Sequence, residues 1–147
     1  MRFQLALNVD NLDQAIDYYR RLFGVELNKR EPGYANFVVD SHNLKLVLFE
    51  APGAERLNHV GFELFDDAEV NASAGRLEGA GVLDERQNAE VCCFARQNKA
   101  ISYDPQGLMW EWYRVLEDSP TFFEAAETKE AACCAESAAP AGAGCCG

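Results

Sequence analysis

The spacing of hydrophobic residues changes from a strand-like to a helix-like period near residue 10. Residues 4–9 form the apolar run QLALNV, which is typical of a strand. In residues 11–24, NLDQAIDYYRRLFG, apolar side chains recur every three or four positions and predict one face of a helix. Asp10 or Asn11 can cap the start of this helix, and Gly24 can end it. Three short strands separated by PG and SHN turns are predicted to follow, at residues 26–31, 34–39 and 45–50.

The second half of the chain repeats the same order of elements. A strand is predicted at residues 58–65 and a helix at 66–81, followed by strands at 82–94, 99–104 and 109–115. Each half therefore reads β-α-β-β-β over about 55 residues. Because neither half has enough apolar surface to be stable alone, we expect both to curl into one mixed sheet around a shared cleft. The predicted fold class is α+β, with paired βαβββ modules.

One domain is predicted at residues 1–116, with its modules at 1–53 and 57–116, and the hydrophobic pattern ends there. Residues 117–147 are rich in alanine, glycine and small polar residues, and they contain six acids and one lysine. Few large apolar side chains follow Phe123. We expect this segment to be a disordered, acidic, cysteine-containing tail.

The composition excludes several classes of partner. The chain of 147 residues is 48% hydrophobic, which is enough for a core, and its formal net charge is -11. An acidic protein lacks the basic face that phosphate contacts require, which argues against nucleic acid and anionic membranes. No apolar run reaches the length of a membrane span, and the N-terminal run is too short for a signal peptide. We therefore expect a cytoplasmic protein.

All cysteines of the chain occur as adjacent pairs, Cys92-Cys93, Cys133-Cys134 and Cys145-Cys146. An even number suggests disulfides in a secreted protein, but without an export signal a reducing compartment with free thiols fits better. For one isolated pair, the ordinary interpretation is a strand in which one cysteine packs as a small hydrophobic residue. That interpretation weakens here because the pairing occurs three times, twice in a segment without a core.

Three polar side chains lie at positions that the repeat defines. Gln4 opens the first strand of module one, His59 opens the first strand of module two, and Glu111 lies in the last strand. These residues are 55 and 52 positions apart, so they come together in space only if a pseudo-twofold axis relates the modules. Such a mixed set of nitrogen and oxygen donors suits a divalent transition metal. Module one has Val47 at the position of Glu111, so we expect three protein ligands and an open face for substrate or dioxygen.

Each of these residues also has an ordinary structural interpretation. His59 can be a hydrogen-bonded histidine of a strand, and Gln4 can face water. Glu111 is harder to explain in this way, because an inward-facing carboxylate without a partner needs a cation. Arg96 and Lys99, which closely follow the first cysteine pair, can lower the pKa of the thiols or can simply be solvated residues of a loop.

Paired βαβββ modules with ligands on the first strand of each module and on the last strand resemble the vicinal oxygen chelate superfamily, over residues 1 to about 116. Three stretches narrow the resemblance to the ArsI/CadI group: FQLALNVDNLDQAIDYYRRLFG, KREPGYANFVV followed by LKLVLFEAPG, and CCFA with DPQGLMWEWY. This group contains organoarsenical carbon–arsenic lyases and cadmium-induced proteins, and the cysteine-rich tail is similar to theirs as well.

The resemblance implies a nonheme Fe(II) enzyme that uses dioxygen to cleave the C–As bond of trivalent methyl or aryl arsenicals, releasing arsenite. It implies Gln4, His59 and Glu111 as metal ligands and Cys92 and Cys93 as arsenic ligands. Gln4 departs from the usual set of two histidines and one carboxylate, so another divalent metal stays open. A trivalent arsenical with one organic group has two exchangeable positions, which two soft thiolates can occupy.

Two other functions stay open on the sequence. One is a non-catalytic, heavy-metal-inducible protein that binds cadmium or arsenite, and the other is a different enzyme of the superfamily, such as a glyoxalase-like isomerase or a thiol transferase. The tail cysteines Cys133, Cys134, Cys145 and Cys146 would capture arsenic or metal for the body, or sequester metal independently. The expected ligands are small molecules and dioxygen, and the protein is expected to be a monomer or a homodimer.

Overall fold

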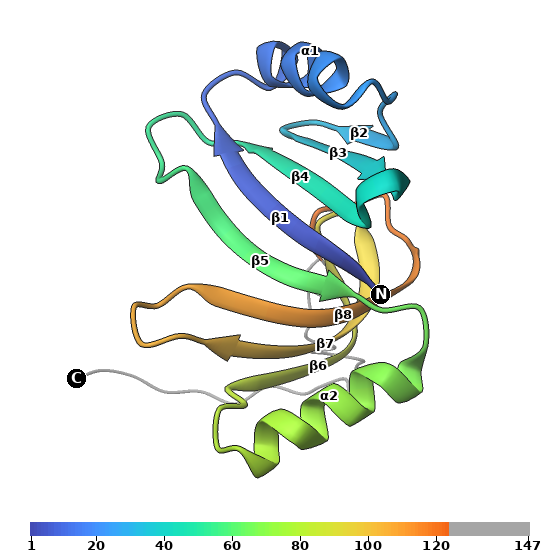
Figure 1. The fold of residues 1–147 in the computed structure, drawn as a ribbon, viewed down its shortest axis with the longest axis vertical. Coiled ribbons are helices and arrows are strands. Elements are labelled where there is room, and N and C mark those ends of the chain that lie inside the picture. Colours follow the sequence, from blue (N-terminus) through green and yellow to red (C-terminus); the bar gives the residue numbers. More distant parts are fainter. Residues whose placement is uncertain (124–147) are drawn as a thin grey trace, which may run out of the picture.

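A mixed β-sheet of eight strands, curled on itself, forms the centre of the molecule (Figure 1). The computed structural model describes residues 1–123. The predictions for the acidic tail and its four cysteines fall on residues 124–147, outside the described residues, apart from the first few positions of the tail. The strand order is β2-β3-β4-β1-β5-β8-β7-β6, and the two modules meet where β1 and β5 pair as antiparallel neighbours.

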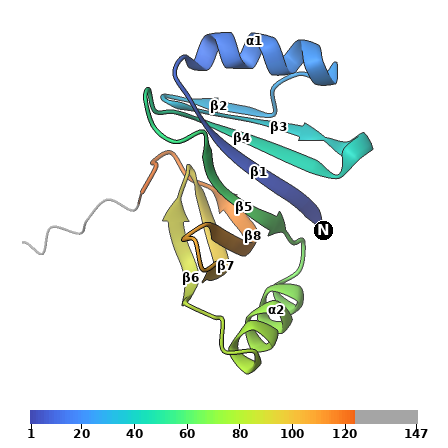
Figure 2. The same ribbon diagram turned by 60° about the vertical axis from the view of Figure 1, so that its left-hand side comes forward.

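The order of elements is the one predicted for each half. Module one contains β1 (Arg2–Val9), α1 (Leu12–Phe23), β2 (Lys29–Glu31), β3 (Tyr34–Val39), a short 3-10 helix η1 (Asp40–His42) and β4 (Leu44–Glu50). Module two contains β5 (Leu57–Glu63), α2 (Asp67–Gly79), β6 (Glu85–Cys92), β7 (Ala95–Tyr103) and β8 (Met109–Asp118). The helices lie at opposite ends of the molecule, each on the outer side of its own half of the sheet (Figure 1, Figure 2). The predicted α+β fold with paired βαβββ modules is confirmed.

Helix α1 begins and ends at the residues that its sequence indicates. The side chain of Asn11 accepts a hydrogen bond from the backbone N–H of Gln14 and caps the first turn. Gly24 ends the helix in the left-handed conformation, at φ 65°. Leu12 and Ile16 are buried against the outer face of the sheet of module one, where they form the largest hydrophobic cluster. The polar, inner face of the sheet is thereby left to form the site.

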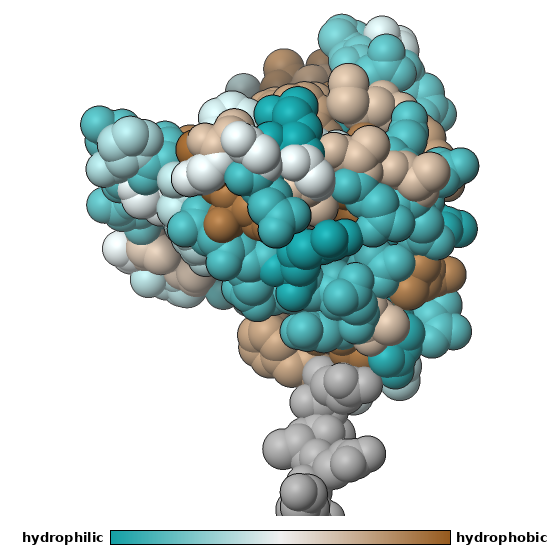
Figure 3. All heavy atoms as spheres, turned by 90° about the horizontal axis from the view of Figure 1, so that it is seen from below, coloured by the Kyte–Doolittle hydropathy of each residue, from teal (hydrophilic) through white to brown (hydrophobic). Residues whose placement is uncertain are grey.

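Helix α2 covers the second half of the sheet in the same way. Its side chains Val70, Ala74 and Leu77 are buried, and Leu77 and Ala74 pack against Ala100 of β7. Seen from below, at the end of the molecule that carries α2, the surface is mainly hydrophilic, with apolar residues in scattered patches (Figure 3). Within residues 1–123, neither helix has the length and apolar character that a membrane crossing requires.

The strand registers show how the two modules correspond. In module one, β1 and β4 are parallel neighbours with Ala6 opposite Val47. In module two, β5 and β8 are parallel neighbours with Gly61 opposite Glu111. Since Gln4 and His59 each lie two residues before the first member of their pair, Val47 occupies the position of Glu111, as the repeat predicts.

Several predicted boundaries are wrong, most of them by a few residues. β2 begins at Lys29 rather than at residue 26, and β8 continues to Asp118 rather than ending at residue 115. Residues 82–94 do not form one strand, because β6 ends at Cys92 and β7 begins at Ala95. The chain reverses there in a two-residue hairpin turn, which a Cys-Phe sequence does not signal.

Candidate active site

The three predicted metal ligands converge inside the curled sheet. The Gln4 Nε2 atom lies 3.0 Å from His59 Nε2 and 2.7 Å from Glu111 Oε1. The distance between His59 Nε2 and Glu111 Oε1 is 3.4 Å. All three side chains are buried, with exposures of 4%, 5% and 2%. The prediction that Gln4 can face water is therefore wrong, and one chain is enough to bring the three residues together.

Local packing fixes the two ligand candidates of module two. Gly61 faces Glu111 across the β5–β8 pair, and a Cβ at Gly61 would lie 2.6 Å from the Glu111 carbonyl oxygen and 2.7 Å from its Cγ. A glycine is therefore required for the close approach of these strands. His59 Nδ1 lies 2.6 Å from Asn58 Oδ1, and the Asn58 amide nitrogen donates to Asn8. Because the Asn58 oxygen can only accept, the proton of the His59 ring lies on Nδ1, and the lone pair of Nε2 is directed at the site.

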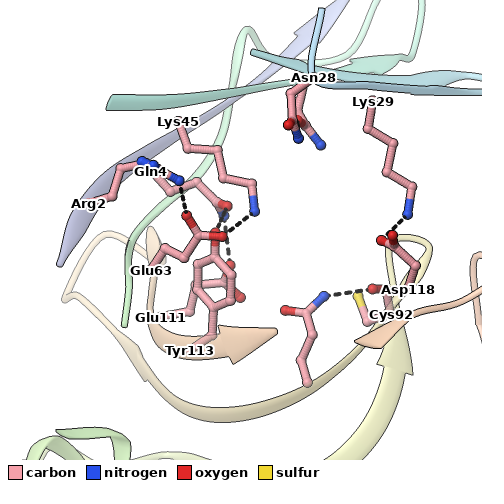
Figure 4. A network of polar contacts seen from close by, with 12 residues as sticks. Arg2, Gln4, Asn28, Lys29, Lys45, Glu63, Cys92, Glu111, Tyr113 and Asp118 are labelled. Atoms are coloured by element: carbon pink, nitrogen blue, oxygen red, sulfur yellow. Dashed lines mark hydrogen bonds and ion pairs between the residues drawn. The ribbon is translucent and has the colours of Figure 1, made fainter. Parts of the chain in front are cut away.

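A buried tyrosine holds the Gln4 amide. The Tyr113 hydroxyl donates a hydrogen bond to Gln4 Oε1. Burial raises the pKa of Tyr113 well above its usual value, so this hydroxyl stays protonated. Tyr113 lies two positions after Glu111 on β8 and so shares its inward face. Figure 4 shows Gln4, Glu111 and Tyr113 directed toward one another, beside the pairs that Glu63 forms with Arg2 and Lys45.

The carboxylate of Glu111 has a cation from the protein itself. Lys99 Nζ lies 2.9 Å from Glu111 Oε2, and the Lys99 side chain is 7% exposed. Burial alone would raise the pKa of Glu111, but the Lys99 ammonium holds it well below its usual range. The prediction that a solvated loop carries Lys99 is wrong, because this residue lies inside β7. Burial of Glu111 by itself thus does not demand a metal ion.

The donor geometry nevertheless fits a divalent metal. Ligand atoms about 2.1 Å from one ion and at right angles to each other are separated by about 3.0 Å. The three distances here, 2.7, 3.0 and 3.4 Å, are close to that separation. A half-turn of the Gln4 amide would direct its oxygen to the ion, and the Tyr113 hydroxyl can accept from the displaced nitrogen. In residues 1–123 no cluster of three His, Cys, Asp or Glu side chains could hold a metal, so Gln4 is needed to complete the set.

Cys92 and Cys93 lie beside these donors at the β6–β7 turn. The two Sγ atoms are 2.9 Å apart. Cys93 and Phe94 are the central residues of the turn and have φ values of 58° and 61°, as a type I′ hairpin requires. Non-glycine residues are uncommon in this region, and backbone strain of this kind concentrates at functional sites.

The two thiols differ in acidity. The hydrogen bond from Cys93 lowers the pKa of Cys92 to about 6, against the effect of burial, and the Lys99 ammonium contributes. The same hydrogen bond and burial raise the pKa of Cys93. Near neutral pH these directions favour a thiolate on Cys92 and a thiol on Cys93. A thiolate is the reactive form toward soft electrophiles and metals.

Two cavities meet at the donors and the thiols. The outer cavity, of about 430 Å³, is lined by both cysteines, His59 and Glu111, and by the aromatic side chains Phe49, Phe122 and Phe123. The inner cavity, of about 160 Å³, includes Cys93, His59 and Glu111, and the other residues that line it are mostly polar. Its polar walls include the Lys29–Asp118 and Lys45–Glu63 ion pairs (Figure 4). No sequence pattern predicts the wall formed by Phe122 and Phe123, because these residues lie beyond the repeat.

Comparison with known proteins agrees with this architecture. The family model of the Glyoxalase/Bleomycin resistance protein/Dioxygenase superfamily matches residues 3–112. The cadmium-induced protein CadI of Mycobacterium tuberculosis is 50% identical over 122 residues, which are 82% of this chain and 80% of that protein. The trivalent organoarsenical cleaving enzyme of Thermomonospora curvata is 41% identical over 152 aligned positions, 99% of each chain. The Mn(II)-bound glyoxalase of Novosphingobium aromaticivorans shares the fold, with a TM-score of 0.59, 18% identity, and coverage of 79% of this chain and 39% of that one.

Proposed function

This chain belongs to the Glyoxalase/Bleomycin resistance protein/Dioxygenase superfamily and, within it, to the ArsI/CadI group, and on that premise we propose that it cleaves the C–As bond of trivalent organoarsenicals. The proposed reaction depends on Fe(II) and dioxygen and detoxifies methyl or aryl arsenicals by releasing arsenite. The free thiols require a reducing compartment such as the cytoplasm.

One observation carries the proposal: a pair of free thiols shares one cavity with His59 and Glu111, two of the three metal-type donors. Cys92, Cys93, His59 and Glu111 all line the outer cavity. Arsenic in R–As(OH)2 exchanges both hydroxyl groups for thiolates, so the two sulfurs hold it while the C–As bond remains intact. A protein that only sequestered arsenic would need the thiols but not the buried donors next to them.

Each residue of the site has a defined part in this proposal. Cys92 and Cys93 bind arsenic and direct its organic group toward the three donors, which removes the entropy of a bimolecular encounter. Gln4, His59 and Glu111 would hold Fe(II), which supplies the activation of dioxygen when bound. Lys99 fixes one carboxylate oxygen of Glu111 and favours the thiolate form of Cys92.

The stoichiometry of the proposed reaction follows from its atoms. Methylarsenous acid and one molecule of dioxygen together contain the atoms of formaldehyde and arsenous acid, so this substrate needs no reductant. An aryl arsenical would give a phenol and arsenous acid only with an additional two-electron reductant, such as a thiol. Equal amounts of dioxygen consumed and arsenite released are therefore expected for the methyl substrate.

The test uses the purified full chain, loaded with Fe(II) and supplied with methylarsenite in air. Release of arsenite, production of formaldehyde and consumption of dioxygen are measured together. A Cys92→Ser variant should keep its metal content and lose tight arsenical binding and turnover. If Cys92→Ser releases arsenite at the wild-type rate, the assignment of the thiols is wrong.

A second candidate function is supported by the high identity to the cadmium-induced proteins, which is 50% over 82% of this chain. In this case the thiols and the buried donors would sequester a thiophilic ion such as Cd²⁺ without turnover. Binding of methylarsenite or Cd²⁺ with no arsenite release in the Fe(II)-loaded protein would favour sequestration. No binding of either would favour a different enzyme of the superfamily, such as a glyoxalase-like isomerase or a thiol transferase.

A further inference from the structure

The segment that follows β8 returns to the thiol pair. The backbone N–H of Cys93 donates to the Phe122 carbonyl over 2.7 Å, and the N–H of Ser119 donates to the Phe94 carbonyl over 2.8 Å. Cys92 and Phe123 form an isolated antiparallel bridge. Residues directly opposite each other in such a pair have Cβ atoms about 5 Å apart. The Phe123 side chain is therefore placed next to the Cys92 thiol by backbone pairing.

Two rings of this segment, together with Phe49 of β4, form one wall of the outer cavity. We call it the aromatic wall and define it as Phe49, Phe122 and Phe123. The Phe122 ring lies 4.6 Å from Phe123, 6.1 Å from Phe49 and 5.4 Å from Phe94, all in edge-to-face geometry. Phe122 is fixed by these contacts, whereas Phe123 remains 64% exposed. An exposed phenylalanine that is held beside a reactive thiol pair has an apolar ring face available to a ligand.

The size of the cavity discriminates between organic groups. Once arsenic is bound to both sulfurs, its third substituent is the only apolar part of the ligand. A methyl group would leave most of the 430 Å³ cavity to water. A phenyl group can contact the aromatic wall and replace that water, which favours binding by the area that it buries.

We propose that the aromatic wall is a recognition site for the aryl group of arylarsenicals and that Phe123 determines the preference of the thiol pair for aryl over methyl arsenicals. This inference rests on the proposed function, because it takes Cys92 and Cys93 as the arsenic ligands. In the binding step, two As–O bonds break and two As–S bonds form, and the two hydroxyl groups leave as water with the one proton of the thiol pair and one proton from solvent. No redox change is involved.

The test measures binding of phenylarsenite and methylarsenite to the metal-free protein by competition with a small dithiol. The full chain is used with its four tail cysteines, Cys133, Cys134, Cys145 and Cys146, replaced by serine, so that only one thiol pair binds. The Phe123→Ala variant should bind phenylarsenite about five times more weakly, from the usual strength of an aromatic pair, with methylarsenite unchanged. Phe123→Tyr should keep the wild-type preference.

The control variant is Phe65→Ala, which removes a similarly exposed ring in the β5–α2 loop. It should change neither affinity. If Phe123→Ala weakens both arsenicals equally, or neither, the aromatic wall does not recognise the aryl group and the inference is overturned. If neither arsenical binds the parent protein with its intact Cys92-Cys93 pair, the proposed function itself fails, and that outcome is distinct from binding without aryl preference.

Discussion

Replacement of Lys99 by methionine tests how the site stabilises a buried carboxylate. Methionine has nearly the shape of lysine, so the variant removes the ammonium without leaving a large cavity. Glu111 is 2% exposed and would keep its hydrogen bond from Gln4 Nε2, but it would lose the partner 2.9 Å from its second oxygen. The metal-free protein should therefore unfold more easily, because one member of a buried ion pair is left alone.

The expected loss can be estimated from the geometry. Breaking a buried pair by removing one partner destabilises by about 3–5 kcal/mol. For a chain of this length, each kcal/mol lowers the melting temperature by about 2–4 °C, so a decrease of roughly 10 °C is expected. A divalent ion bound by Gln4, His59 and Glu111 would supply positive charge in place of the ammonium. Addition of the metal should therefore recover much of the lost stability.

The sign of the pH dependence follows from the direction of the pKa shifts. In the wild type the pKa of Glu111 is below its unfolded value of about 4.3, so its stabilising contribution is fully present above that pH. In the variant, burial without Lys99 raises the pKa of Glu111, and its ionised form is destabilising at neutral pH. The difference in unfolding free energy between the two proteins should therefore shrink as pH falls from 7 to 4.

The assay is thermal and urea denaturation with and without Fe(II) or Mn(II) under anaerobic conditions. Lys45→Met is the matched control, since Lys45 also forms a buried ion pair, at 2.7 Å, but with Glu63, a carboxylate that is not one of the three donors. Metal should rescue Lys99→Met and not Lys45→Met. If metal-free Lys99→Met unfolds within about 1 kcal/mol of the wild type at pH 7, Glu111 does not depend on Lys99. Equal rescue of both variants would contradict the placement of the metal at Glu111.

Three further perturbations test the same site. Gly61→Ala should lower the free energy of unfolding by about 1–3 kcal/mol in urea denaturation and weaken metal binding, because the added Cβ would overlap β8. Gly75→Ala in α2 is the control, and it should not destabilise the protein because Gly75 has open space around it. Tyr113→Phe removes the hydroxyl that would accept from the Gln4 amide nitrogen once the amide oxygen binds the ion, and it should lower metal affinity by about tenfold, measured by calorimetry. An unchanged affinity would show that the hydroxyl does not orient the amide. Because the pKa of Cys92 is lowered to about 6, its alkylation by iodoacetamide should rise through pH 6 and level off near neutrality, and a midpoint above pH 8 would contradict the thiolate assignment.

The sequence by itself determined the modules and the three converging donors. Hydrophobic periodicity and capping residues act over a few positions, so α1 could be placed between Asn11 and Gly24 from local patterns. The repeat relates residues far apart by symmetry, and for this reason Gln4 and His59 could be matched across the modules without knowledge of any contact. Val47 could be identified as the counterpart of Glu111 by the same reasoning.

The tertiary structure alone decided which partners these residues have. The pairing of Lys99 with Glu111 joins β7 to β8, and the bond from Tyr113 to Gln4 joins β8 to β1. Such pairs depend on strand register and on the curl of the sheet, which no local pattern encodes. The turn at Cys93 has no glycine or asparagine to mark it, so its conformation follows from the pairing of β6 with β7. The return of Phe122 and Phe123 to the thiols likewise required the folded chain, because these residues lie outside the repeat and are ordered by contacts with the completed turn.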